Sequence, residues 1–189
     1  MTVLYLGILI FTLPHLFSTL APAVRDRLKA RFGEKAFKGT YAALSWIGLI
    51  AVAYGYWVTR GNGEMLYVPG LGARHATLSL ATLGFILIGA GMGKSHLRLW
   101  LQNPFSIGVA LWYIGHLIGV GKTSVDLIYL MFLVVAVADI IFSMARGKRP
   151  DFAPVWSSDV KAVVIGLVLT AIFVLWFHPY VLGVYPLGQ

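Results

Sequence analysis

Six apolar stretches follow one another along the chain, separated by short polar segments. They cover residues 3–21, 40–58, 76–92, 104–120, 127–144 and 160–177. Each stretch is close to the roughly 20 residues that a helix needs to cross the hydrocarbon of a bilayer. Turn-forming sequences such as RGNGE, VPGLG and RGKRPDFAP stand between them. The pattern predicts an all-α, polytopic membrane helical bundle of about six transmembrane helices.

The composition supports the same class. Hydrophobic residues make up 59% of the chain and charged residues 12%, and the mean hydropathy is +0.82. These values lie outside the range of soluble globular proteins, so we expect the lipid bilayer as the main partner. Six spans with short connections leave no room for a soluble domain, and we treat residues 1–189 as one transmembrane domain. The chain has no cysteine, which excludes disulfides, thiolate metal sites and iron–sulfur clusters.

The basic residues are distributed unevenly over the connections. Twelve of the 15 Lys and Arg residues fall in the first, third and fifth connections, including the start of the last span. Short loops rich in Lys and Arg stay on the cytoplasmic side of the membrane. We therefore expect a cytoplasmic (inner) membrane protein with both termini outside. The net charge of +8 could also indicate nucleic acid binding. No aromatic-interleaved basic surface accompanies it, and we therefore expect no nucleic acid partner. The three basic residues left on the outer side are Arg60, Arg74 and Lys122.

Two histidines fall within predicted spans. His15 lies about 18 Å below the outer surface at 1.5 Å per residue, and His116 lies roughly 10 Å below it. An imidazole inside the hydrocarbon needs hydrogen-bonding or metal partners that lipid cannot supply. Histidines that face one another across a bundle can hold haem iron axially. The alternative is a hydrogen bond from each ring to a neighbouring helix, through Ser, Thr, Tyr or a carbonyl.

The residues around His116 fit either interpretation. Gly115 and Gly119 form a small-xxx-small pair, which leaves room for a flat macrocycle or lets another helix approach closely. Trp112, one turn before His116, can stack on a porphyrin edge or belong to an interfacial aromatic belt. The sequence alone leaves these alternatives open.

Three further positions contribute candidate chemistry. His178, near the outer end of the last span, is an alternative partner for His116 or an interfacial residue in contact with water, and we expect Pro179 to end its helix. His75 and His96 lie at the membrane edges and are interpreted as solvated residues or headgroup contacts. Asp139 is acidic and lies within a span, where we expect pairing with Arg98, Arg146 or His15, or solvation near the interface.

Three segments carry a family resemblance over nearly the whole chain. They are PHLFSTLAPAVRDRLKARFGEKAFKGTYAALSWIGL, NPFSIGVALWYIGHLIGVG and FHPYVLGVYPL, and together they resemble the NnrU family of bacterial membrane proteins. That family is similar to plant zeta-carotene isomerase, a membrane enzyme thought to use haem b with histidine axial ligands. It is also associated with nitrite and nitric oxide reduction in denitrifying bacteria. The resemblance implies haem b as cofactor, with His15 and His116 at the ligand positions.

One departure from the family pattern concerns Asn103. The family usually has His-Pro thirteen residues before the middle histidine, whereas this chain has Asn103 and Pro104. If the missing histidine acts in catalysis or ligand exchange, the chain binds haem without the isomerase chemistry; if it is an interfacial cap, Asn103 can replace it. The resemblance implies redox or isomerase-like chemistry on an apolar small molecule, or binding of nitric oxide. The competing interpretation is a non-catalytic accessory protein with structural histidines and no haem.

Overall fold

The computed structural model describes residues 1–59, 63–147 and 149–186, and this part of the chain is helical apart from its connections. The basic residues Arg60 and Lys148, which enter the orientation argument, lie outside the described residues. The helices are α1 (Thr2–Leu20), α2 (Pro22–Phe32), α3 (Glu34–Thr59), α4 (Leu71–Gly91), α5 (His96–Leu101), α6 (Pro104–Val120), α7 (Thr123–Ala145), α8 (Trp156–Ile172) and the π-helix η1 (Phe173–Leu182).

The six predicted spans correspond to six long helical segments. Within the described residues, five helical segments are long and apolar enough to cross a membrane, namely α1, α3, α4, α7 and the continuous α8–η1 segment. The sixth, α6, is apolar and has 17 residues. At 1.5 Å per residue it is about 26 Å long, close to the thickness of the hydrocarbon core. The prediction of a polytopic all-α membrane bundle is confirmed.

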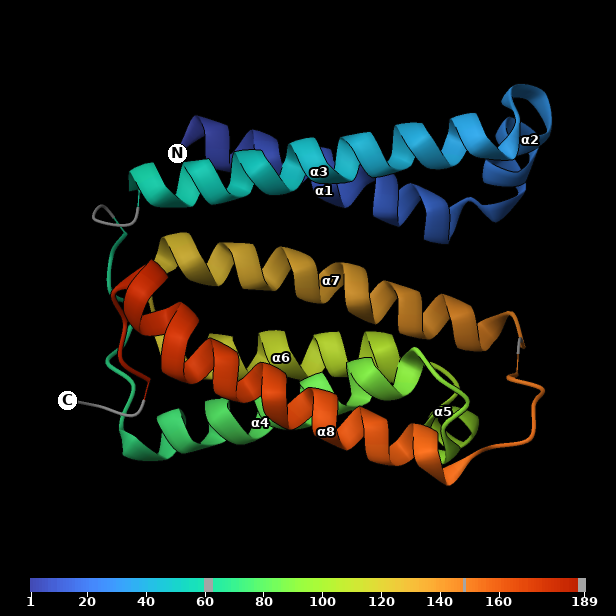
Figure 1. Ribbon diagram of the computed structural model, residues 1–189. Coiled ribbons are helices and arrows are strands. Elements are labelled where there is room, and N and C mark those ends of the chain that lie inside the picture. The colour runs from blue at the N-terminus through green and yellow to red at the C-terminus, as the bar shows by residue number, and fades with distance from the viewer. Residues whose placement is uncertain (60–62, 148, 187–189) are drawn as a thin grey trace.

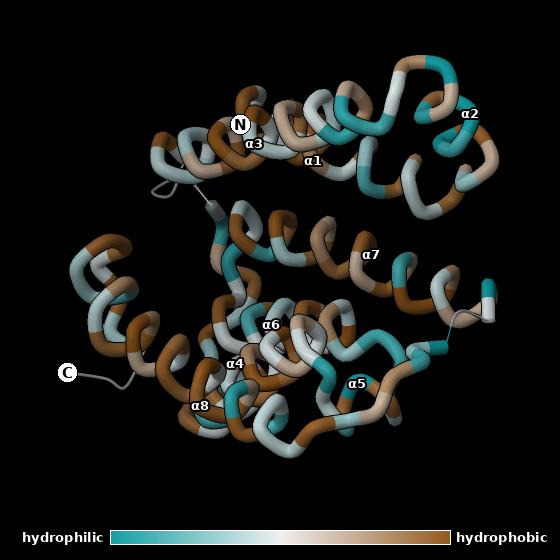
Figure 2. Tube along the Cα trace, turned by 45° about the vertical axis from the view of Figure 1, so that its right-hand side comes forward, coloured by the Kyte–Doolittle hydropathy of each residue, from teal (hydrophilic) through white to brown (hydrophobic). Residues whose placement is uncertain are grey.

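Two shorter helices, α2 and α5, lie in connections and were not predicted. Helix α2 begins with Pro22 at its first position, where the missing N–H costs no hydrogen bond, and is followed by Gly33 at φ 87°. Helix α5 begins after Ser95, whose side chain accepts a hydrogen bond from the Arg98 amide. Both lie at the end of the bundle opposite the start of α1 and the end of η1 (Figure 1). In Figure 2 the region of α2 and the segments around α5 carry much of the hydrophilic colour, while the spans are mostly apolar.

Most of the helices pack against antiparallel neighbours, whereas α1 and α7 run parallel to each other. Helix α1 packs on α3, α4 packs on α6 and on α8, and α7 contacts both α6 and α1 (Figure 1). In the described part of the chain, α1 and α6 are not packed directly against each other. Glycines permit the closest crossings: a Cβ on Gly84 would lie 2.6 Å from the Gly108 carbonyl oxygen. This α4–α6 contact uses the small-residue packing typical of membrane helices.

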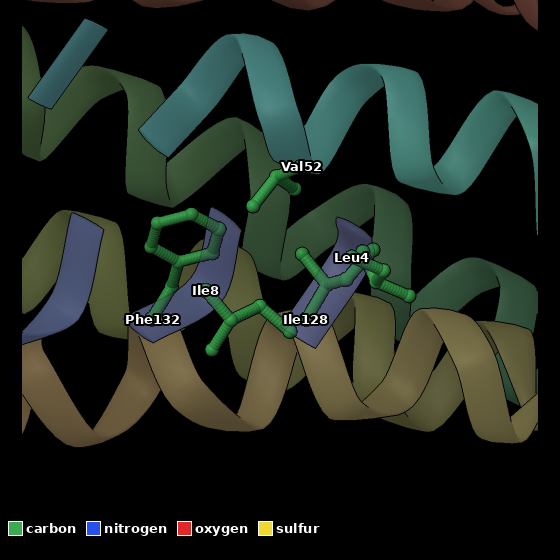
Figure 3. Close-up of a cluster of buried hydrophobic side chains, with 5 residues drawn as sticks. All are labelled: Leu4, Ile8, Val52, Ile128 and Phe132. Atoms are coloured by element: carbon green, nitrogen blue, oxygen red, sulfur yellow. The ribbon is translucent and has the colours of Figure 1, made fainter. Parts of the chain in front are cut away.

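A buried apolar cluster joins α1, α3 and α7. Leu4 and Ile8 of α1 meet Val52 of α3 and Ile128 and Phe132 of α7 (Figure 3). Large side chains on the outward faces remain exposed, as expected for surfaces that lipid covers. The cluster fixes α7 against the α1–α3 pair, and Tyr113 of α6 packs against the same cluster.

Candidate functional site

A cavity of about 600 Å³ lies at the end of the bundle where α1 begins and η1 ends. Its walls come from the first turns of α4 and α7, the last turns of α6, the π-helix η1, and the segments 65–69 and 184–186. This volume is within the range of about 300–1,000 Å³ typical of small-molecule sites. The lining is mainly aromatic and aliphatic, with two imidazoles among the polar groups.

His116 belongs to α6 and is buried, with 7% of its surface exposed. Its Nδ1 lies 2.8 Å from the Trp112 carbonyl oxygen, one helical turn earlier. Because a carbonyl only accepts, Nδ1 carries the proton and Nε2 is left with its lone pair. The ring also lies 4.7 Å from the Tyr129 ring of α7, centre to centre. The imidazole is therefore held in one orientation by its own helix and by α7.

His178 reaches the same cavity from η1. Its Nδ1 donates to the Phe173 carbonyl at 2.7 Å, five residues earlier, which is the spacing of a π-helix. The His116 and His178 rings lie 6.2 Å apart with an interplanar angle of 21°. The cavity separates η1 from α6, so only side chains approach each other across it.

The expectation that Pro179 ends the last helix is wrong. The helix continues to Leu182, with Pro179 inside the π-helical segment. A proline cannot donate to the ladder, and the wider π turn is one way in which a helix accommodates a local irregularity. π-Helical turns occur frequently at functional sites. Here the segment places His178, which is partly buried, beside His116.

His15 lies in a different cluster. Its Nδ1 donates to the Phe11 carbonyl at 2.7 Å, and its ring stacks on Phe11 and lies near Tyr41 of α3. Phe11 contacts Phe132 of α7, which is one turn further along that helix than Tyr129, the neighbour of His116. His15 does not line the cavity. The structure brings His116 to His178 and leaves His15 beyond an aromatic layer, and the sequence-based pairing of His15 with His116 stays a prediction.

The other candidate cofactor residues divide between the cavity and helix packing. Trp112 lines the cavity and meets His116 edge-on at 5.1 Å between ring centres. Gly119 also lines the cavity, whereas Gly115 faces α4, where its carbonyl accepts a 2.7 Å hydrogen bond from Thr77. The glycine pair therefore lets α4 approach α6 beside the cavity.

Asp139 has partners that the sequence did not indicate. Its Oδ2 accepts hydrogen bonds from the Asn103 amide at 2.8 Å and from the Ser106 hydroxyl at 2.6 Å. Asn103 also donates to Ser143, and its Oδ1 caps α6 by accepting from the Ser106 amide. The residue that departs from the family pattern therefore ties the start of α6 to α7, at the end of the bundle opposite the cavity.

The histidines at the membrane edges differ from each other. His75 is exposed in the first turns of α4. His96 is not simply solvated, because its ring lies 2.7 Å from Asp159 of α8 and stacks on Trp156. Asp159 also accepts from the amides of His96 and Leu97, so it caps α5. No group of three or more His, Asp or Glu side chains with the geometry of a metal site occurs among the described residues.

The comparison with protein families agrees with this architecture. The family model described as NnrU protein matches residues 3–186, nearly the whole chain. The chain belongs to the NnrU family. No curated protein and no solved structure matches this member of the NnrU family. The resemblance noted in the sequence is confirmed, and the chain is a multi-pass membrane protein of that family.

Proposed function

We propose that this protein binds haem b in the cavity, with His116 and His178 as the axial ligands, and acts in electron transfer or redox sensing in the cytoplasmic membrane. The observation that carries the proposal is the presence of two imidazoles in the lining of one cavity, each with Nδ1 donating to its own helix and Nε2 left as a possible metal ligand. The His116 and His178 ring centres are 6.2 Å apart.

The hydrogen bonds of both rings support the same proposal. Each Nδ1 donates to a carbonyl of its own helix, so both imidazoles are in the tautomer that offers Nε2 to a metal. Such bonds on the far side of a ligating imidazole fix its orientation and raise its basicity. Both side chains line one cavity of about 600 Å³, whose volume suits a cofactor.

The residues around the pair suit a redox role. When bound, haem b supplies one-electron chemistry at its iron, tuned by the axial ligands and by the polarity of the pocket. The aromatic side chains of Phe85, Trp112 and Phe173 line the cavity and limit access of water to the two histidines. Two histidine ligands leave no open position, which favours electron transfer or sensing over substrate binding at the metal.

The family's association with nitrite and nitric oxide reduction supports a denitrification setting for this redox role. Isomerase-like chemistry on an apolar molecule, or binding of nitric oxide, would require one axial histidine to leave. The interpretation as an accessory protein without haem explains the hydrogen bonds of His116 and His178, but it gives no reason for both imidazoles to line one cavity of about 600 Å³.

The experiment is purification from cells with an ample haem supply, followed by a pyridine haemochrome assay and an absorption spectrum. We expect one b-type haem per chain and the bands of a six-coordinate, low-spin iron. His75→Ala is the control, because His75 is exposed and does not line the cavity. A protein that purifies without haem and does not bind added haem would contradict the proposal.

A further inference from the structure

Two cationic side chains lie at the rim of the cavity. Arg74, in the first turns of α4, and Lys122, directly before α7, both belong to its lining, and no Asp or Glu does so among the described residues. Arg74 is exposed and makes no side-chain ion pair within the described part of the chain. An apolar cavity with a cationic rim is complementary to a molecule that has an apolar body and an anionic end.

The charge distribution over the membrane makes the position of these two residues informative. Only Arg60, Arg74 and Lys122 fall on the predicted outer side, where Lys and Arg are sparse. Two of these three residues line one cavity. The preference of Lys and Arg for cytoplasmic loops explains the basic residues on that side of the membrane, but it does not explain Arg74 and Lys122 on the predicted outer side. Their place in the lining puts two positive charges beside any ligand that occupies the cavity.

The rim is also held in place by the bundle. The Tyr67 hydroxyl donates to the Leu117 carbonyl of α6, and the Leu66 amide donates to the Gly121 carbonyl at 2.8 Å. An isolated bridge pairs Met65 with Lys122. These bonds fix the segment before α4 against the end of α6, so the Lys122 backbone is positioned before a ligand arrives.

We infer that Arg74 and Lys122 bind the carboxylate groups of the cavity's ligand. This inference rests on the proposed function, in which the ligand is haem b, a macrocycle whose edge carries two propionates. Arg and Lys pair with carboxylates through charge-assisted hydrogen bonds, which are stronger than neutral ones. The two cations then select for a free dicarboxylate and set which edge of the ligand faces the outer surface. A phospholipid headgroup offers the same anionic chemistry, and the test separates these two sources.

The test compares haemin with haemin dimethyl ester, in which both carboxylates are neutral. Each compound is titrated into the detergent-solubilised, haem-free full chain, and the dissociation constant is read from the absorption change. The variants are Arg74→Gln and Lys122→Gln, and the control is Lys38→Gln, whose charge pairs with the exposed Glu34 at the other end of the bundle. We expect each rim variant to weaken haemin binding roughly fivefold, as for a partly exposed ion pair. Binding of the ester should be unchanged, which also shows that the variants are folded.

The outcomes distinguish the inference from the function on which it rests. A loss that is confined to haemin and to the two rim variants supports the inference. Two results overturn the inference but leave haem binding intact: equal affinities for haemin and ester in every variant, or equal losses for both compounds. Equal affinities in every variant are expected if the two cations bind lipid headgroups. If the unmodified chain binds neither compound, both the inference and the proposed function are overturned.

Discussion

The imidazole rings of His116 and His178 line one cavity with their centres 6.2 Å apart and their planes at 21°, although one belongs to α6 and the other to η1. Each ring is fixed by a hydrogen bond from Nδ1 to its own helix. A packing role needs only one satisfied polar contact per ring. Two oriented rings with a shared cavity are the arrangement on which the proposed haem site depends.

The crossing of α4 and α6 depends on glycine. A Cβ on Gly108 would collide with the Gly84 carbonyl oxygen and lie 2.9 Å from the Ile88 amide nitrogen. We expect Gly108→Ala to destabilise the protein by about 1–3 kcal/mol, the usual cost of overpacking, in thermal unfolding of the detergent-solubilised protein. Gly39→Ala is the matched control, because nothing lies within 4 Å of its Cβ position. Equal stability of the two variants would contradict the proposed packing.

The side-chain amide of Asn103 donates to Asp139. We expect the loss of this hydrogen bond to destabilise the bundle. Asn103→Asp keeps an oxygen that can cap α6 but replaces the donor by a second carboxylate beside Asp139. Removal of a hydrogen bond to a charged group costs about 1.5–3 kcal/mol. Unfolding measurements on Asn103→Asp and Asn103→Ala should show that both lose stability. If Asn103→Asp is as stable as the unmodified protein, the cap alone matters and the contact with Asp139 does not.

The histidine that the family usually has at position 103 can be restored. Position 103 directly precedes α6, thirteen residues before His116, which is about 20 Å along a helix. We therefore expect Asn103→His to leave the absorption spectrum of the haem-loaded protein unchanged. A new ligand spectrum, or a gain of isomerase-like activity, would show that the departure from the family pattern is functional.

The orientation in the membrane is tested with fusions. Figure 1 places the start of α1 and the end of η1 at one end of the bundle, as an even number of spans requires. The distribution of basic residues predicts that this end is outside. A reporter that is active only outside the cytoplasm should therefore work after Gln189 and fail when it is inserted at Arg31. The reverse pattern of activities would reject this orientation.

The spans could be predicted from the sequence because their signal is local. The apolar run at 104–120 coincides with α6, three of the other runs fall within helical segments, and the runs 3–21 and 76–92 extend one residue past the ends of α1 and α4. Helices α2 and α5 were missed because they depend on caps and polar contacts, such as the Ser95 cap, and on no apolar run. Length and hydropathy do not detect helices of this kind.

The sequence could not show which histidine lies beside His116 in the bundle. The depths estimated from the sequence place His15 and His116 at similar levels in the membrane. Depth alone does not show which helices are neighbours. Helix α1 packs on α3 and α7, and α6 packs on α4 and α7, so aromatic side chains lie between the two histidines. The position of His178 depends on the π-helical turn through Pro179, which the sequence had indicated as a helix end.

The most direct test of the account is one panel of absorption spectra on three variants, His15→Ala, His116→Ala and His178→Ala, each purified with haem and compared with the unmodified protein. Removal of one axial nitrogen leaves five-coordinate iron, so the low-spin bands should be lost. We predict this loss for His116→Ala and for His178→Ala, and an unchanged low-spin spectrum for His15→Ala. Loss of the bands in His15→Ala, together with their retention in His178→Ala, would contradict the assignment and support His15 as the partner of His116.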